Sequence, residues 1–238
     1  MDRTAHPHPQ PSALPAWLAT VALALGVPAL SVLAGASWLW IGYGALSWVA
    51  AIPIKILLTW LASVVIPAEW WRTRAAIFAL LSAASELGVA WMAVILADTP
   101  PGVVDMLAFG IAAGAIEALI LSAAGWLAPP SADTAERWEG AARASFCVRN
   151  MFFLERGIAL AGHTGSRALI AYATVTAAPG PAASAAAFAI VTFMATDGIA
   201  YVAHERQWNW MDPAVCRRFF SLLAVIAALE LALFTVLA

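Results

Sequence analysis

The sequence predicts an all-α fold, a polytopic membrane helix bundle of about seven transmembrane helices with the N-terminus cytoplasmic and the C-terminus outside. Composition is the first reason. Of the 238 residues, 63% are hydrophobic and 11% are charged, and the mean hydropathy is +0.85. Soluble domains carry about 25% charged residues, so this chain has too little charge to cover a water-exposed surface. We expect membrane lipids as its surroundings, and the lack of a basic tract predicts no nucleic-acid partner.

Long apolar stretches are the second reason. A spanning helix needs ~20 mostly apolar residues, and the stretches here are separated by turn-forming segments such as "DTPPG" and "APGP". We expect residues 1–15, a polar and proline-rich tail, to be disordered in the cytoplasm. Residues 16–238 are expected to form a single transmembrane domain. The predicted spans are 17–36, 39–65, 75–97, 103–127, 152–177, 182–203 and 215–237.

The distribution of arginine and lysine is the third reason, and it sets the orientation. The connections near 37, 98–102 and 178–181 contain neither residue, whereas the connections on the other side are rich in arginine. The positive-inside rule places the arginine-rich side in the cytoplasm, which predicts a multi-pass protein of the inner (plasma) membrane. The arginines on that side are Arg3, Arg72, Arg74, Arg137, Arg143, Arg149, Arg206, Arg217 and Arg218.

Residues 134–151 form one cytoplasmic connection that is more than a simple loop. Charged and apolar residues alternate there at helical spacing, which predicts a short helix lying on the inner membrane surface. Cys147 and Cys216 both fall on the cytoplasmic side. We therefore expect them to be free thiols, and they lack metal-ligand spacing.

Several ionisable residues lie inside the predicted spans, where charge is costly unless it is paired or has a function. We predict that five of them, from four spans and at similar depth, converge on one buried polar site. Glu117–His163 is one candidate pair and Asp197–Arg167 is another, although the sequence does not show which partners meet. The five residues are Glu86, Glu117, His163, Arg167 and Asp197.

Other ionisable groups lie nearer the ends of the spans. Glu155 and Arg156 are expected at the cytoplasmic mouth of the polar site. Lys55 is expected to extend along its apolar stem to the cytoplasmic headgroups. His204 is expected at the membrane interface, and it would join the site only if the sixth helix were displaced or the site lay toward the cytoplasm. Glu230 either pairs with a neighbour or stays protonated.

The stretch "FGIAAGAIEALILSAAG" carries small residues at four-residue spacing, namely Gly110, Gly114 and Ala118. Such a stripe lets two helix backbones approach closely. Glu117 lies next to this stripe, so we expect its side chain to point into the bundle.

Four short motifs follow one another in the order found in a known family. They are "GALSWVAAIPIK" at 44–55, "SELGVAW" at 85–91, "GIAAGAIEA" at 110–118 and "ERGIALAGHTGS" at 155–166. With them, roughly residues 40 to 204 resemble the YhfC-like intramembrane metalloproteases, a group related to PrsW-like proteases and to the glutamate-dependent proteases that process CAAX proteins. The resemblance implies metal-dependent hydrolysis of a membrane-embedded protein or peptide.

The resemblance also implies roles for individual residues. Glu86 corresponds to the second carboxylate of a glutamate pair and Glu117 to the glutamate of a glycine-rich motif; both are candidate catalytic residues. His163, Glu117 and Asp197 are the candidate zinc ligands. The supporting polar residues would be Glu155, Arg156, Arg167 and His204, and Ser166 also matches its motif.

The chain departs from the family pattern at positions that matter for metal chemistry. Ala113 and Phe193 stand where histidines are expected, Ser85 where the first carboxylate is expected, and Val89 where an arginine is expected. A catalytic zinc needs about three protein ligands and one open position, and the remaining set is rich in oxygen. Three functions stay open: a divergent intramembrane hydrolase, a non-catalytic membrane binding or assembly module, and a small proton-coupled transporter.

Overall fold

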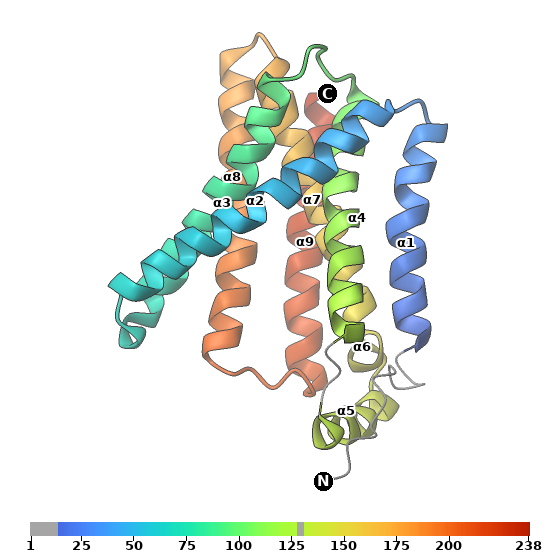
Figure 1. Cartoon of the computed structure of the whole chain (residues 1–238), viewed down its shortest axis with the longest axis vertical. Coiled ribbons are helices and arrows are strands. Elements are labelled where there is room, and N and C mark those ends of the chain that lie inside the picture. The colour runs from blue at the N-terminus through green and yellow to red at the C-terminus, as the bar shows by residue number, and fades with distance from the viewer. Residues whose placement is uncertain (1–13, 128–130) are drawn as a thin grey trace.

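A computed structural model describes residues 14–127 and 131–238, all of whose regular elements are helical. The tail expected at 1–15 therefore lies almost wholly outside the described residues. Figure 1 shows long helices packed side by side, with short helices across one end of the bundle. The elements are α1 (Leu14–Leu33), α2 (Trp38–Val65), η1 (Ala68–Trp70), α3 (Trp71–Ile95), α4 (Val103–Leu127), α5 (Ala132–Ala144), α6 (Phe146–Arg149), α7 (Met151–Val175), α8 (Pro179–Glu205) and α9 (Pro213–Leu237).

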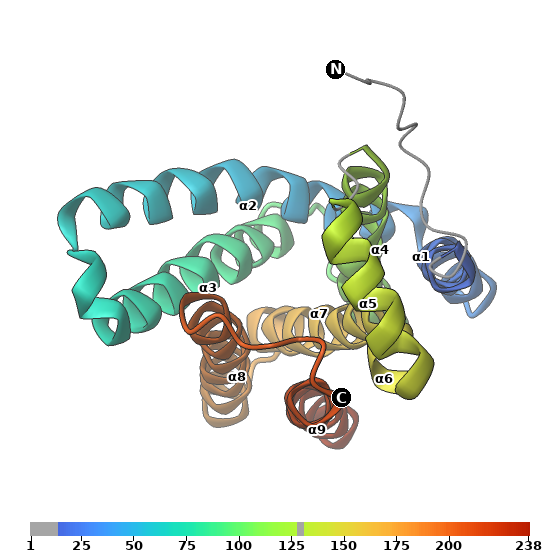
Figure 2. The ribbon, with the colours of Figure 1, turned by 90° about the horizontal axis from the view of Figure 1, so that it is seen from below.

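Within the described residues, six helical segments are long and apolar enough to cross a membrane: α1, α2, η1 with α3, α4, α8 and α9. The chain is therefore a multi-pass helical membrane protein. The remaining long helix, α7, carries charged and polar side chains along its length. It lies among the other helices rather than at the edge of the bundle (Figure 2), where α3, α4, α8 and α9 pack around it. This placement keeps its polar residues away from the outer surface.

The arginine-rich connections gather at one end of the bundle. The start of α3, the short helices α5 and α6, and the connection from α8 to α9 all lie at the lower end in Figure 1. The start of α1 lies at this end too, whereas the C-terminus lies at the opposite end. The charge asymmetry of the sequence is thus an asymmetry between the two ends of the folded bundle.

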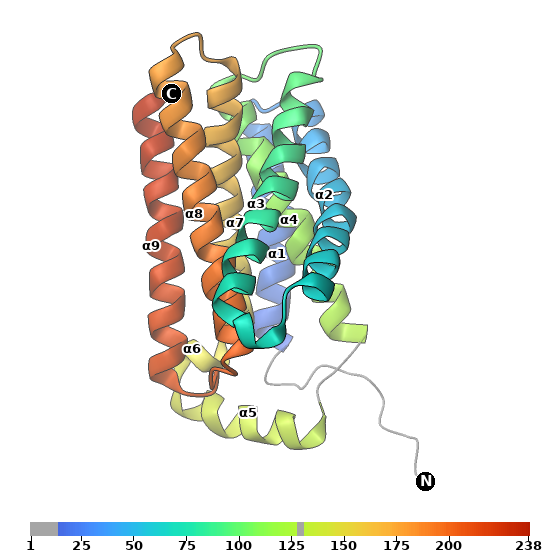
Figure 3. The same cartoon turned by 90° about the vertical axis from the view of Figure 1, so that its left-hand side faces the viewer.

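The helix expected over 134–151 is two helices instead of one. Ser145 has an extended backbone (φ −140°, ψ 123°), and its hydroxyl accepts a hydrogen bond from the backbone N–H of Val148 at 3.4 Å. A serine in this role ends one helix and begins the next. Figure 3 shows α5 lying across the ends of the long helices.

The prediction of free thiols is wrong, because Cys147 and Cys216 form a disulfide. The bond joins α6 to the first turn of α9. Both residues are buried in a cluster that includes Val148 and Phe220. The two cysteines are 69 residues apart in the sequence, so their meeting depends on the folding of α6 against α9.

Candidate functional site

The site begins with the close approach of α4 to α7. A methyl group added at Gly110 would lie 2.6 Å from the carbonyl oxygen of His163, and one added at Gly114 would lie 2.7 Å from Cα of Leu160. The predicted small-residue stripe therefore faces α7. Since no larger side chain separates the two backbones, Glu117 on α4 reaches His163 on α7.

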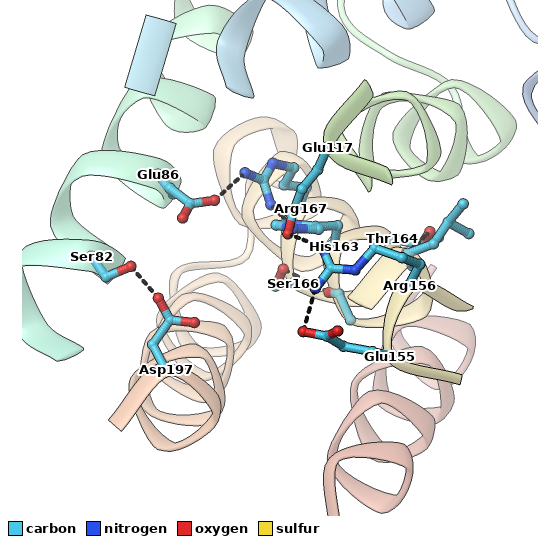
Figure 4. Close-up of polar contacts among 12 residues, drawn as sticks. Ser82, Glu86, Glu117, Glu155, Arg156, His163, Thr164, Ser166, Arg167 and Asp197 are labelled. Atoms are coloured by element: carbon cyan, nitrogen blue, oxygen red, sulfur yellow. Dashed lines mark hydrogen bonds and ion pairs between the residues drawn. The ribbon is translucent and has the colours of Figure 1, made fainter. Parts of the chain in front are cut away.

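Helix α7 supplies three nitrogen-bearing side chains to this region, Arg156, His163 and Arg167. His163 and Arg167 are four residues apart and Arg156 is seven residues before His163, so the three share one face of the helix. Figure 4 shows these side chains together with the carboxylates of Glu86, Glu117 and Glu155, while Asp197 of α8 lies to one side and points toward Ser82.

One half of the site is a set of ion pairs around Glu86. Lys55 on α2 contacts Glu86 at 2.8 Å and Asp197 at 3.0 Å. The hydroxyl of Ser82 also donates to Asp197. The other carboxylate oxygen of Glu86 accepts from Arg167 at 3.1 Å. Helices α2, α3, α7 and α8 are thus joined through these polar contacts.

The other half continues from Arg167 through His163 to Glu117. A guanidinium can only donate hydrogen bonds, so Nδ1 of His163 accepts from Arg167 and Nε2 donates to Glu117. Glu117 also accepts from Arg156 at 2.6 Å, and Arg156 donates to Glu155 at 2.7 Å.

These contacts form one continuous line of polar side chains across five helices, which we call the ion-pair chain. The middle of the ion-pair chain is buried and both ends are more exposed: the side chains of Glu86 and Arg167 are 3% and 0% exposed, whereas that of Asp197 is 28% exposed and that of Glu155 is 46% exposed. A buried charge without a partner is expensive, whereas here each buried carboxylate contacts a cation. In order, the members are Asp197, Lys55, Glu86, Arg167, His163, Glu117, Arg156 and Glu155.

A cavity of about 170 Å³ lies beside the ion-pair chain. One part of its wall is polar and includes Glu117, His163 and Asp197. Another part is apolar and comes from α7, α8 and α9, with Phe193 and Ile226 among its residues. The cavity is therefore amphipathic. Its polar wall offers hydrogen-bonding and charged groups that the hydrocarbon interior of a membrane lacks.

Most of the residues expected at the site do meet, but the pairing differs from expectation. The Glu117–His163 pair is present, whereas the expected Asp197–Arg167 pair is wrong: Arg167 contacts Glu86 and Asp197 contacts Lys55. Arg167 lies deeper in the bundle, beside α3, while Asp197 is 28% exposed. Depth along the helix axis did not reveal which helices are neighbours.

Lys55 behaves differently from its prediction, and His204 does not take the supporting role at the polar site. Lys55 does not reach toward the headgroups. Helix α2 continues ten residues beyond it to Val65, and its ammonium group bridges two carboxylates. The signal in the sequence was its membership of the 44–55 motif. His204 is exposed near the end of α8 and does not line the cavity.

As they lie, the predicted zinc ligands do not fit a metal ion. Both ring nitrogens of His163 are engaged, and Glu117 and Asp197 each contact a cation that would repel a metal. In the part of the chain that the structure describes, no group of three or more His, Cys, Asp or Glu residues is placed to hold a metal ion. Arg156 supplies the positive charge beside Glu117, and Lys55 supplies it beside Asp197.

The fold and the site define a multi-pass helical membrane protein with a buried ion-pair chain. Comparisons with protein-family models, with curated proteins and with solved structures find no match to this chain.

Proposed function

We propose that this protein is a membrane-embedded binding module whose cavity accepts the polar end of a membrane-borne molecule. The observation that carries the proposal is the combination of a fully paired inner ion-pair chain with an amphipathic cavity beside it. The ion-pair chain holds the helices in place, and the cavity offers polar groups on one side and apolar side chains on the other. A cavity of about 170 Å³ is smaller than pockets for drug-sized ligands, which span roughly 300–1,000 Å³. It suits one end of an amphiphile.

The pairing of charged and polar groups within the ion-pair chain favours a binding function over hydrolysis. A general base works best when it is not already held by cations. Both ring nitrogens of His163 are engaged, and Glu86 and Glu117 each accept from two donors, at least one of them a cation, that balance their charge. These groups are arranged to stabilise one another, which is also a sufficient use of charge within a membrane.

Photolabelling of the protein in lipid nanodiscs tests the proposal. Gly162 lines the cavity and has no neighbour within 4 Å of an added Cβ, so we expect Gly162→Phe to place its ring in the cavity with no clash at Cβ. Gly42→Phe is the matched control, because Gly42 has the same open space but does not line the cavity. With a diazirine-bearing phosphatidylethanolamine as the probe, we expect labelled peptides from α7 and α9 that Gly162→Phe removes and Gly42→Phe keeps. Labelling that is unchanged in Gly162→Phe overturns the proposal.

Hydrolysis of a membrane peptide is the second candidate function. The contact between Glu117 and His163 at the cavity wall favours it, because a carboxylate beside an imidazole is a common pair in acid–base chemistry. The test is incubation of the reconstituted protein with fluorogenic transmembrane peptides. Cleavage that is lost in both Glu117→Gln and His163→Ala supports hydrolysis and contradicts a purely binding role.

We also propose that all seven long helices cross the inner (plasma) membrane, with the N-terminus in the cytoplasm and the C-terminus outside. The gathering of arginines at one end of the bundle supports this orientation. The disulfide lies at the same end, although disulfides are rare in the cytosol. Because the proposed orientation places the C-terminus outside, alkaline phosphatase fused after Ala238 should be active, and green fluorescent protein fused there should be dark. The reverse result would place the disulfide on the oxidising side and overturn the orientation.

A further inference from the structure

Glu230 on α9 is a deeply buried carboxylate outside the ion-pair chain. It is 1% exposed and lies 17 residues past the start of α9, which is ~26 Å at 1.5 Å per residue. The hydroxyl of Thr192 donates to its Oε1 at 2.5 Å. Oε2 has no hydrogen-bond partner among the described residues, and Glu230 lines the cavity.

The space for Glu230 depends on a glycine of α7. A methyl group added at Gly165 would lie 2.5 Å from Cβ of Glu230 and 3.1 Å from its Oε2. Position 165 is two residues beyond His163 and two before Arg167, so Glu230 packs at the level of the deepest members of the ion-pair chain. Glu230 also lines the cavity, and we call the part of the cavity at this level its floor.

The cations of the site are already used by other carboxylates. Lys55 contacts Glu86 and Asp197, Arg156 contacts Glu117 and Glu155, and Arg167 contacts Glu86. None of these cations lies within ion-pair distance of Glu230. Among the described residues around the cavity, carboxylates therefore outnumber cations, and Glu230 is the carboxylate that makes no ion-pair contact.

We propose that the floor of the cavity binds a primary ammonium group, with Glu230 as its counter-ion; this rests on the proposed binding function and names the chemistry of the ligand. An isolated carboxylate in an apolar interior is strongly disfavoured, and a cation provides the missing charge. Phe193, which follows Thr192 in the sequence, lines the same cavity, and aromatic rings attract cations. The apolar wall formed by Leu223 and Ile226 accommodates the hydrocarbon attached to the ammonium group.

Hexylammonium chloride is the probe, with 1-hexanol as its neutral counterpart of the same length. We expect hexylammonium to raise the unfolding midpoint of the protein in phosphatidylcholine nanodiscs in a saturable manner, since a ligand of the folded state stabilises it, whereas hexanol does not. This comparison uses the unmodified chain, so it does not depend on a variant that folds. Equal shifts with both compounds overturn the proposal.

Variants locate the binding group. Glu230→Gln keeps the size of the side chain and an acceptor for Thr192 but removes the charge. We expect it to weaken hexylammonium binding by roughly tenfold or more, as for the loss of a hydrogen bond to a charged group. Glu69→Gln, which changes an exposed carboxylate of η1, should leave the affinity unchanged. Equal affinity in Glu230→Gln and the unmodified chain overturns the assignment.

Two further arms separate the source of the ammonium group and the two proposals. Weaker hexylammonium binding in nanodiscs that contain phosphatidylethanolamine identifies a lipid headgroup as the competing ammonium, and unchanged binding identifies a free amine. If Gly162→Phe abolishes photolabelling but hexylammonium and hexanol act alike, the binding function stands and the ammonium proposal fails. If Gly162→Phe also leaves the photolabelling intact, both fail.

Discussion

Nε2 of His163 on α7 donates a hydrogen bond to the carboxylate of Glu117 on α4, across two helix backbones that touch at glycines. The same imidazole accepts from Arg167 through Nδ1. This one side chain links the two halves of the ion-pair chain. Its position depends on the small residues of α4 as much as on its own helix.

The close approach of α4 to α7 should make Gly114 intolerant of even a methyl group. Gly114→Ala places a Cβ 2.7 Å from Cα of Leu160, and overpacking typically costs about 1–3 kcal/mol. Gly88→Ala is the control, because an added Cβ there has no neighbour within 4 Å, and the change should be neutral or stabilising. Thermal unfolding in detergent, followed by circular dichroism, measures both. A Gly114→Ala variant as stable as Gly88→Ala would contradict the helix contact.

Removing Arg167 should destabilise the fold more than removing it together with its partner. Arg167 is fully buried and Glu86 is 3% exposed. Loss of one member of a buried pair costs about 3–5 kcal/mol, less the part that Lys55 still provides to Glu86. The double variant Arg167→Met, Glu86→Gln has neither the guanidinium nor the carboxylate. No charge is then left without this partner, so part of the stability should return. The free energies of unfolding of the two single variants and the double variant give the coupling. Additive effects would mean that the pair does not stabilise the fold.

The Cys147–Cys216 disulfide predicts that the purified, unreduced chain carries no free thiol. Alkylation with iodoacetamide under denaturing conditions should leave the mass unchanged, and prior reduction should add two alkyl groups. Cys147→Ser serves as the control, since it exposes the Cys216 thiol to the reagent without reduction. Two alkyl groups added without reduction would rule out the bond.

The paired donor set predicts that the purified protein holds far less than one zinc per chain. His163, Glu117 and Asp197 would each have to leave a present partner to bind a metal. Elemental analysis of detergent-purified protein, with a zinc-loaded enzyme as the positive control, measures the content. Stoichiometric zinc that disappears in His163→Ala would favour the hydrolase over the binding module.

Composition and periodicity were sufficient for the helical membrane class, and the Gly110–Gly114 stripe correctly indicated a close helix contact. Both depend on features that are local in the sequence: apolar length, turn residues and four-residue spacing. Glu117 beside the stripe was accordingly expected to face inward, and it does. That Glu86, His163 and Asp197 converge could also be predicted from the sequence, because charged side chains within a membrane must avoid lipid.

The choice of partners was decided only by the tertiary structure. Lys55 lies 142 residues from Asp197 and 31 from Glu86, and no sequence pattern shows that its side chain reaches from α2 to both α3 and α8. The disulfide is of the same kind, since it depends on α6 folding back onto α9. A sequence determines that buried charges need partners, because the energetic cost is a property of each group. Which partners they find depends on the packing of distant helices, because an ion pair forms only where side chains come within a few ångströms.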